Sequence, residues 1–193
     1  MKKIIALILA LACILALASC AAEGVNLDAY KTAIANTAPS SVIISVTTYD
    51  TAFGVELTGT YTVTYYEDST ARVVGEYQVM NSATTDELTS TIPVDATIAA
   101  DGTVTGDGVS ASVAAAAGLS IDLGAPIKSS IVARGILTAN IEQANTAAVL
   151  GAELPSDASL ELRMADSEGT KIGQATINYS DDRGTVRIVC QYD

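Results

Sequence analysis

Strict alternation of apolar and polar residues is the feature of this sequence that most limits its fold. It is clearest from Val55 to Tyr66, where a threonine or a glutamate follows nearly every apolar position. The residues on the apolar side are Val55, Leu57, Gly59, Tyr61, Val63 and Tyr65. Successive side chains of a strand point to opposite faces, so this period of two predicts a strand with one buried and one wet face.

Two neighbouring segments extend this strand into a meander. Ser41 to Asp50 is rich in β-branched residues, and Ala71 to Asn81 places Val73, Tyr77 and Val79 at inward positions. Residues 51–54 and 67–70 are short and carry turn-forming residues. We therefore expect three sequential antiparallel strands joined by short turns.

The C-terminal third has the same character. We predict strands at Ala158 to Met164, Lys171 to Tyr179 and Thr185 to Tyr192. The segments between them, 165–170 and 181–184, each contain a glycine, which tolerates positive φ and favours a hairpin turn.

The middle of the chain is less regular. Thr91 to Ala99 alternates and predicts a strand, with Pro93 suited to an edge, and Ile131 to Glu142 is expected to resume the sheet. Asp101 to Gly108 is typical of a turn. The alanine-rich run from Val109 to Leu123 fits a strand and a helix equally well, so its structure stays open.

Two short helices complete the pattern. Leu27 to Thr37 has apolar residues at helical spacing and ends before Pro39, with Asn26 or Asp28 at its start. Asn145 to Gly151 predicts a second helix, with Asn145 as N-cap and Gly151 at its C-terminal end. The fold class is mainly β (α+β), an antiparallel curved sheet or half-barrel of seven to nine strands; a β-sandwich is the alternative.

The first twenty residues have the character of a targeting segment. Lys2 and Lys3 precede the uncharged apolar run Ile4 to Leu17, which is shorter than the roughly 20 residues of a membrane-spanning helix. Leu17-Ala18-Ser19-Cys20 then resembles the lipobox of bacterial lipoproteins. That resemblance implies a diacylglycerol on the Cys20 thiol, acyl chains such as palmitate, and cleavage before Cys20. The alternative is an ordinary secretory signal cut near Ala18 or Ser19.

This reading divides the chain into three parts. Residues 1–19 are the signal peptide, 20–26 the lipidated cysteine with a short linker, and 27–193 a single β-rich domain. A linker of six residues reaches only about 20 Å, so the domain is expected to sit close to the membrane. The predicted location is extracytoplasmic, on the outer face of the cell membrane or, because Ala21 follows the cysteine, on an outer membrane if one is present.

Charge and composition exclude several classes of function. The formal net charge is -12, and it becomes -14 once Lys2 and Lys3 leave with the signal peptide. So acidic a chain does not suit nucleic acid as a partner. The sequence has no histidine, which excludes Ser-His-Asp and Cys-His chemistry. We expect no enzymatic activity, with an acid-dependent hydrolase built on two carboxylates as the minor alternative.

No cofactor or metal site is predicted. Asp101 and Asp107 flank glycines but lack the ligand pattern of a calcium loop, so a polar turn is favoured. Cys190 would be the remaining cysteine after processing, and its place in an alternating strand predicts a buried, unreactive thiol.

A ligand groove is the candidate site. Leu57, Tyr61, Val63, Tyr65 and Tyr77 fall on the apolar faces of adjacent predicted strands. Such tyrosines either belong to a filled core or line a groove on the concave side of the sheet.

The order of elements in residues 26–193 resembles the lipoprotein-carrier family, whose half-barrel is closed by helices. That resemblance implies binding of acyl chains, and no cargo-binding residue of the family carries over. We therefore predict a lipoprotein that binds or carries an apolar or amphiphilic ligand and meets the membrane through Cys20. The alternative is a non-enzymatic surface or envelope interaction module with a filled core and an unknown protein partner.

Overall fold

The computed structural model describes residues 27–80, 89–101, 103–107 and 120–193. Helix α2 spans Leu27–Asn36, and a short 3-10 turn, η1 (Gln143–Asn145), leads into helix α4 (Thr146–Leu150). The strands are β1 (Ser41–Asp50), β2 (Val55–Tyr65), β3 (Ala71–Met80), β4 (Thr89–Ile98), β5 (Val104–Asp107), β6 (Ser129–Ala133), β7 (Ile136–Ile141), β8 (Ala158–Met164), β9 (Ile172–Ser180) and β10 (Gly184–Tyr192).

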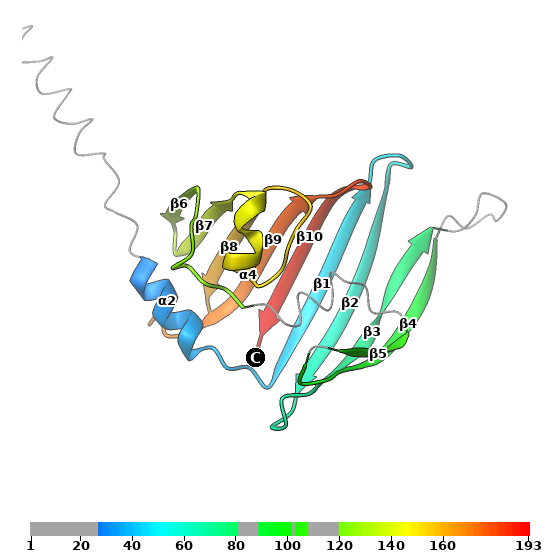
Figure 1. Cartoon of the computed structure of the whole chain (residues 1–193), viewed down its shortest axis with the longest axis horizontal. Helices are drawn as coiled ribbons and strands as arrows, with labels where there is room; N and C mark the ends of the chain where they lie inside the picture. The colour runs from blue at the N-terminus through cyan, green and yellow to red at the C-terminus, as the bar shows by residue number, and fades with distance from the viewer. Residues whose placement is uncertain (1–26, 81–88, 102, 108–119) are drawn as a thin grey trace, which may run out of the picture.

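All ten strands form one open, curved antiparallel sheet (Figure 1). Their order is β5-β4-β3-β2-β1-β10-β9-β8-β7-β6, so the sheet consists of two five-stranded meanders. The meanders meet where the first strand pairs with the last, from Val42 opposite Tyr192 to Asp50 opposite Gly184. The predicted mainly β fold with a curved sheet is confirmed, and the sandwich alternative is wrong.

One face of the sheet carries a continuous apolar surface. A single row crosses the sheet through neighbouring strands and contains Tyr61, Ile44, Cys190, Ala175, Leu162 and Leu137. Each of these side chains is at most 3% exposed. Burial of a large apolar side chain contributes roughly 1.5–3 kcal/mol. Rows like this one therefore hold the strands in their register, since a slip of one residue would turn them to water.

Both helices lie on the half of the molecule formed by β6 to β10 (Figure 1). Helix α2 buries Tyr30 and Ala33 in the core, and after its last turn the Thr37 hydroxyl accepts a hydrogen bond from the backbone N–H of Ile172. Helix α4 buries Val149 and Leu150. The described part of the connection before β6 packs Leu123 into the same core. These segments cover the apolar face on that half.

Helix α4 begins differently from the prediction. The Asn145 side chain makes no cap hydrogen bond; instead the Thr146 hydroxyl donates to the carbonyl of Gln143 and accepts from the N–H of Leu154. Gly151 does end the helix, in the left-handed conformation at φ 72°. The Thr146 hydroxyl thus ties the start of helix α4 to the segment that follows its end.

Two predictions for the middle of the chain are wrong in detail. Val104–Asp107 is an edge strand rather than part of a turn, because the chain reverses already between Ala99 and Thr103. The predicted strand from 131 to 142 is a hairpin, β6 and β7, folded at Arg134 and Gly135 with φ values of 54° and 74°. These two extra strands raise the count to ten. Residues 109–119 of the undecided run lie outside the described residues.

The β2–β3 pair depends on a glycine. A Cβ added to Gly75 would overlap the carbonyl oxygen of Thr60 and lie 2.8 Å from the Cα of Tyr61. Both obstacles are backbone atoms of the neighbouring strand, which cannot turn away as a side chain can. The two strands therefore approach here to a distance that only glycine permits.

We expect Gly75→Ala to destabilise the fold by about 1–3 kcal/mol, the usual effect of forcing an extra methyl group into a packed site. Gly124→Ala is the control, because its Cβ would meet the carboxylate end of the flexible Asp122 side chain. Urea unfolding of both variants measures the difference. Equal stabilities would contradict the close approach of β2 and β3.

Candidate functional site

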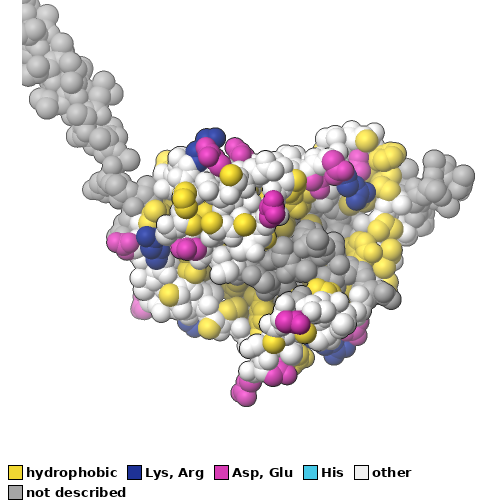
Figure 2. All heavy atoms as spheres, in the orientation of Figure 1, with side chains coloured by type: hydrophobic (Ala, Val, Ile, Leu, Met, Phe, Trp, Pro, Cys, Tyr) yellow, Lys and Arg dark blue, Asp and Glu magenta, His cyan; other side chains and the backbone are white. Residues whose placement is uncertain are grey.

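A half-open pocket of about 240 Å³ lies on the inner face of the sheet, over the central strands. The described residues that line it are Val46, Thr48, Leu57, Thr58, Gly59, Tyr61, Tyr77, Gln78, Val79, Tyr179, Asp181, Arg183 and Val186. They come from β1, β2, β3, β9 and β10 and from the β9–β10 turn. The pocket thus spans the junction of the two meanders. Figure 2 shows acidic side chains scattered over one face of the molecule, with Lys and Arg side chains among them.

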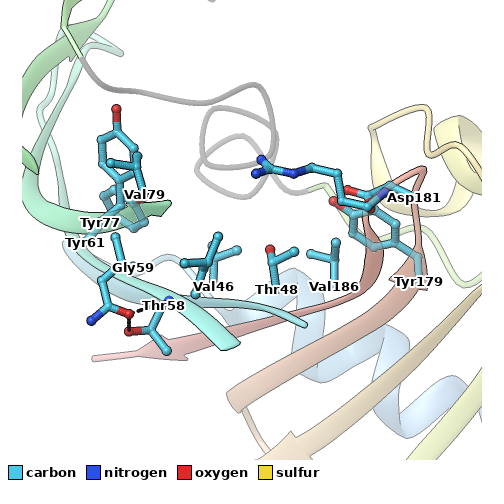
Figure 3. A pocket seen from close by; sticks show the side chains of 13 residues that line it. Val46, Thr48, Thr58, Gly59, Tyr61, Tyr77, Val79, Tyr179, Asp181 and Val186 are labelled. Atoms are coloured by element: carbon cyan, nitrogen blue, oxygen red, sulfur yellow. Dashed lines mark hydrogen bonds between the residues drawn. The ribbon is translucent and has the colours of Figure 1, made fainter. Parts of the chain in front are cut away.

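The floor and walls come from different strands (Figure 3). Val46, Thr48 and Val186 form the floor, and the register places Thr48 beside Val186. Tyr61, Tyr77 and Val79 stand on one side, and Tyr179 with Asp181 on the other. The pocket therefore has a mainly apolar wall from β2 and β3 and a wall with charged groups at the β9–β10 turn.

Gly59 makes room for the tyrosine wall. The Tyr61 side chain leans over it, so that a Cβ at position 59 would lie 2.6 Å from the phenol oxygen. Tyr61 is only 3% exposed, and burial, with a smaller effect of the neighbouring Tyr77, raises the pKa of its phenol. The hydroxyl therefore stays protonated at neutral pH and offers a neutral, mostly apolar surface to the pocket.

The charged end is organised by two turns. Asp50, 3% exposed, accepts hydrogen bonds from the backbone N–H groups of Ala52 and Phe53 through Oδ1. Its Oδ2 lies 3.7 Å from Nε of Arg183. Asp181 accepts from the N–H groups of Arg183 and Gly184, at 2.9 and 3.0 Å, both through Oδ1. Both carboxylates thus hold a turn in place; Asp181 belongs to the lining, and Asp50 contacts the lining residue Arg183.

Three of the five groove residues expected from the sequence line this pocket: Leu57, Tyr61 and Tyr77. Val63 is fully buried in the core, and Tyr65 packs against the core farther along β2. Tyr179 from β9, Val186 from β10 and Arg183 from the turn between them also line the pocket and were not predicted from the sequence. Alternation in β9 and β10 places Tyr179 and Val186 on an apolar face, but it does not say which strands lie beside them.

The lipobox residues Leu17, Ala18, Ser19 and Cys20 lie outside the described residues. Within the described ranges, no helix is long and apolar enough to cross a membrane. Over the same ranges, no three His, Cys, Asp or Glu side chains gather as metal ligands would. Asp101 instead accepts a hydrogen bond from the N–H of Thr103 within a turn. This hydrogen bond lowers the pKa of the Asp101 carboxyl.

No family model matches the chain, and no curated protein does. Among solved structures, the crystal structure of LprF from Mycobacterium bovis is similar, with a TM-score of 0.45 and 14% sequence identity. The similarity covers 85% of this chain and 90% of that one. At this level of similarity the match carries no information about a ligand or a function.

A second group of side chains, in the core or packed against it, has raised pKa values. Burial raises the pKa of the Cys190 thiol to about 12. Burial also raises the pKa of the Tyr65 phenol to about 12, and the nearby Cys190 adds a smaller effect. The pKa of Tyr192 is also raised by burial. Cys190 is the free cysteine of the described chain and is 1% exposed, as expected for a small apolar core residue.

These shifts predict a loss of stability in alkali. A group whose folded pKa is raised stabilises the fold fully below its ordinary pKa and loses that contribution as the pH rises toward the folded value. The ordinary value is 9.0 for the Cys190 thiol, so the free energy of unfolding should fall from about pH 9 toward pH 12. Urea unfolding across this range measures it.

Cys190→Ala supplies the control for this prediction. Without the thiol, the free energy of unfolding should begin to fall nearer pH 10.0, the ordinary pKa of a tyrosine. A free energy of unfolding that stays constant up to pH 12 would show that these groups are not buried as described.

Proposed function

We propose that the chain is a membrane-anchored, extracytoplasmic bacterial lipoprotein whose half-barrel binds or carries an apolar or amphiphilic, lipid-like ligand. The observation that carries this proposal is the half-open pocket between the two meanders. It is lined by aliphatic and tyrosine side chains and has charged groups at one end. Concave, mainly apolar sites with a few polar groups are the usual form of small-molecule sites.

The size of the pocket supports a slender ligand. Its volume of about 240 Å³ lies below the roughly 300–1,000 Å³ common for pockets that enclose drug-sized molecules. The opening to solvent leaves room for part of the ligand outside. An alkyl chain that enters lengthwise, with its polar head at the mouth, fits these dimensions better than a bulky ring system.

The attachment to a membrane rests on the sequence. The Leu17-Ala18-Ser19-Cys20 pattern supports lipidation of Cys20, and helix α2 begins at Leu27, so six residues join the two. Two or more acyl chains give stable anchoring where one gives only weak binding. A domain held this close to a membrane has direct access to lipid-like molecules.

We propose binding rather than catalysis. The chain has no histidine to act as a general base. The carboxylates of Asp50 and Asp181 already accept backbone hydrogen bonds that hold turns in place, so these oxygens serve the fold. These observations favour a carrier or binding protein over an acid-dependent hydrolase.

We expect Thr48→Phe to block the pocket. Thr48 lies on the floor, so a phenyl ring there should displace the ligand and weaken binding of dodecylphosphocholine by roughly tenfold, the effect of losing about 1.4 kcal/mol. Isothermal titration calorimetry of the mature chain, residues 20–193, measures the affinity. Mass spectrometry of the same preparation detects lipid that is retained during purification.

Thr47→Phe is the matched control, because residue 47 is the next one along β1 and points to the outer face. It should leave the affinity unchanged. Equal affinities of all three proteins, with no retained lipid, would contradict the proposal and favour an interaction module with a filled core.

We expect Cys20→Ala to abolish lipidation and cleavage. The variant should remain a longer, unlipidated precursor, because the lipid-accepting thiol is absent. Metabolic labelling with palmitate, followed by electrophoresis of membrane fractions, measures both effects. Cys13→Ala, within the apolar run, should process normally. A labelled and normally cleaved Cys20→Ala product would refute the anchor.

A further inference from the structure

We propose that the pocket selects a zwitterionic amphiphile, with Arg183 binding the anionic group of the head and Asp181 the cationic group. The inference rests on the proposed function, because it concerns the ligand of the same pocket. It follows from the separation of charged and apolar side chains along the lining and from the contacts that the charged ones already make.

The pocket has two chemically different ends. Tyr61, Tyr77 and Val79 stand at one end, while Asp181 projects from the β9–β10 turn at the other (Figure 3). The floor between them is formed by Val46, Thr48 and Val186. A ligand that matches this surface has an apolar tail toward the tyrosines and a polar head toward the turn.

Arg183 can bind an anion at the polar end. Its side chain is 56% exposed and lines the pocket. A guanidinium has five N–H donors, and the ion pair with Asp50, Nε to Oδ2 at 3.7 Å, engages only one edge of it. The remaining donors suit a phosphate or a carboxylate, which guanidinium groups bind through paired hydrogen bonds.

Asp181 can bind a cation beside it. The two backbone hydrogen bonds that it accepts both go to Oδ1, and among the described residues none donates to Oδ2. Asp181 and Arg183 are two residues apart in one turn and line the same pocket. A head that carries both charges can therefore meet both side chains at once.

The local charge favours a zwitterion over a simple anion. At this end of the pocket, Asp181 and Arg183 belong to the lining, Asp50 forms the ion pair with Arg183, and Asp182 lies between the two lining residues in the turn. More distant charges are screened over about 8 Å at physiological ionic strength, so these four dominate. Three acids around one base oppose a purely anionic head, whereas a purely cationic head leaves the guanidinium without a partner. A head with one anionic and one cationic group offers a partner to both Arg183 and Asp181.

Four dodecyl amphiphiles with different heads test the inference. They are dodecylphosphocholine (zwitterionic), dodecyl phosphate (anionic), dodecyltrimethylammonium (cationic) and dodecyl maltoside (uncharged), all used below their micelle concentrations. Titration calorimetry with the mature chain, which contains the whole described core from Tyr30 to Cys190, gives the affinities. Dodecylphosphocholine should bind about three- to tenfold more tightly than the other three, as expected for partly exposed charge pairs.

Two variants should change this order in opposite directions. Asp181→Asn keeps the Oδ1 acceptor of the turn and removes the negative charge. The affinity for dodecyl phosphate should therefore rise relative to the affinity for dodecylphosphocholine. Arg183→Gln should instead favour dodecyltrimethylammonium. Glu161→Gln, on the outer face of β8, and Arg187→Gln, on the outer face of β10, each remove one charge outside the pocket and should preserve the wild-type order.

Arg183→Gln also leaves the buried Asp50 carboxylate without its ion pair, which can lower stability. Asp50→Asn/Arg183→Gln removes both partners and should show the same change of order, provided that its melting curve matches the wild type. The inference would be overturned if the order of affinities were the same in all variants, or if the four amphiphiles bound equally well. In that case the pocket would bind the dodecyl chain without selecting the head. Failure of every amphiphile to bind would refute the proposed function itself.

Discussion

A single sheet with one apolar face is the constraint on which this structure depends. In a sandwich a second sheet would cover that face, whereas here helices and loops must do so. Helix α2, helix α4 and the segment around Leu123 cover the half formed by β6 to β10. Curvature brings the two halves of the face toward each other, and the pocket lies where they meet. The binding site is therefore a result of how the apolar face is covered.

Local patterns predicted most of the strands because each strand of a half-buried sheet shows its own alternation. The predicted bounds of β1 and β8 agree with the structure to the residue. The β6–β7 hairpin was missed although Gly135 lies in its turn, because the other turn residue at positive φ is Arg134, and arginine does not mark a turn as asparagine does. Strand β5 was missed because Gly106 and Asp107, typical turn residues, lie in a strand at the edge.

The candidate site was predictable only within one meander. Leu57, Tyr61 and Tyr77 share a face by alternation and by sequential pairing, and both are visible in the sequence. Tyr179 and Arg183 join them only because β10 pairs with β1, more than a hundred residues away along the chain. Alternation indicates which side of a strand is buried but not which distant strand lies beside it. The part of the pocket that β9, β10 and their turn supply therefore required the structure.

The pairing of β1 with β10 also has a consequence for folding. Strand β1 lies in the middle of the finished sheet, yet its second neighbour consists of residues 184–192, at the end of the chain. A chain that emerges from its N-terminus can complete the first meander early, but an open central edge remains until the last strand arrives. Contacts between such distant segments slow folding, and unpaired edges invite association with other chains. Residues 184–192 close the sheet, and their arrival sets the moment at which the pocket can exist.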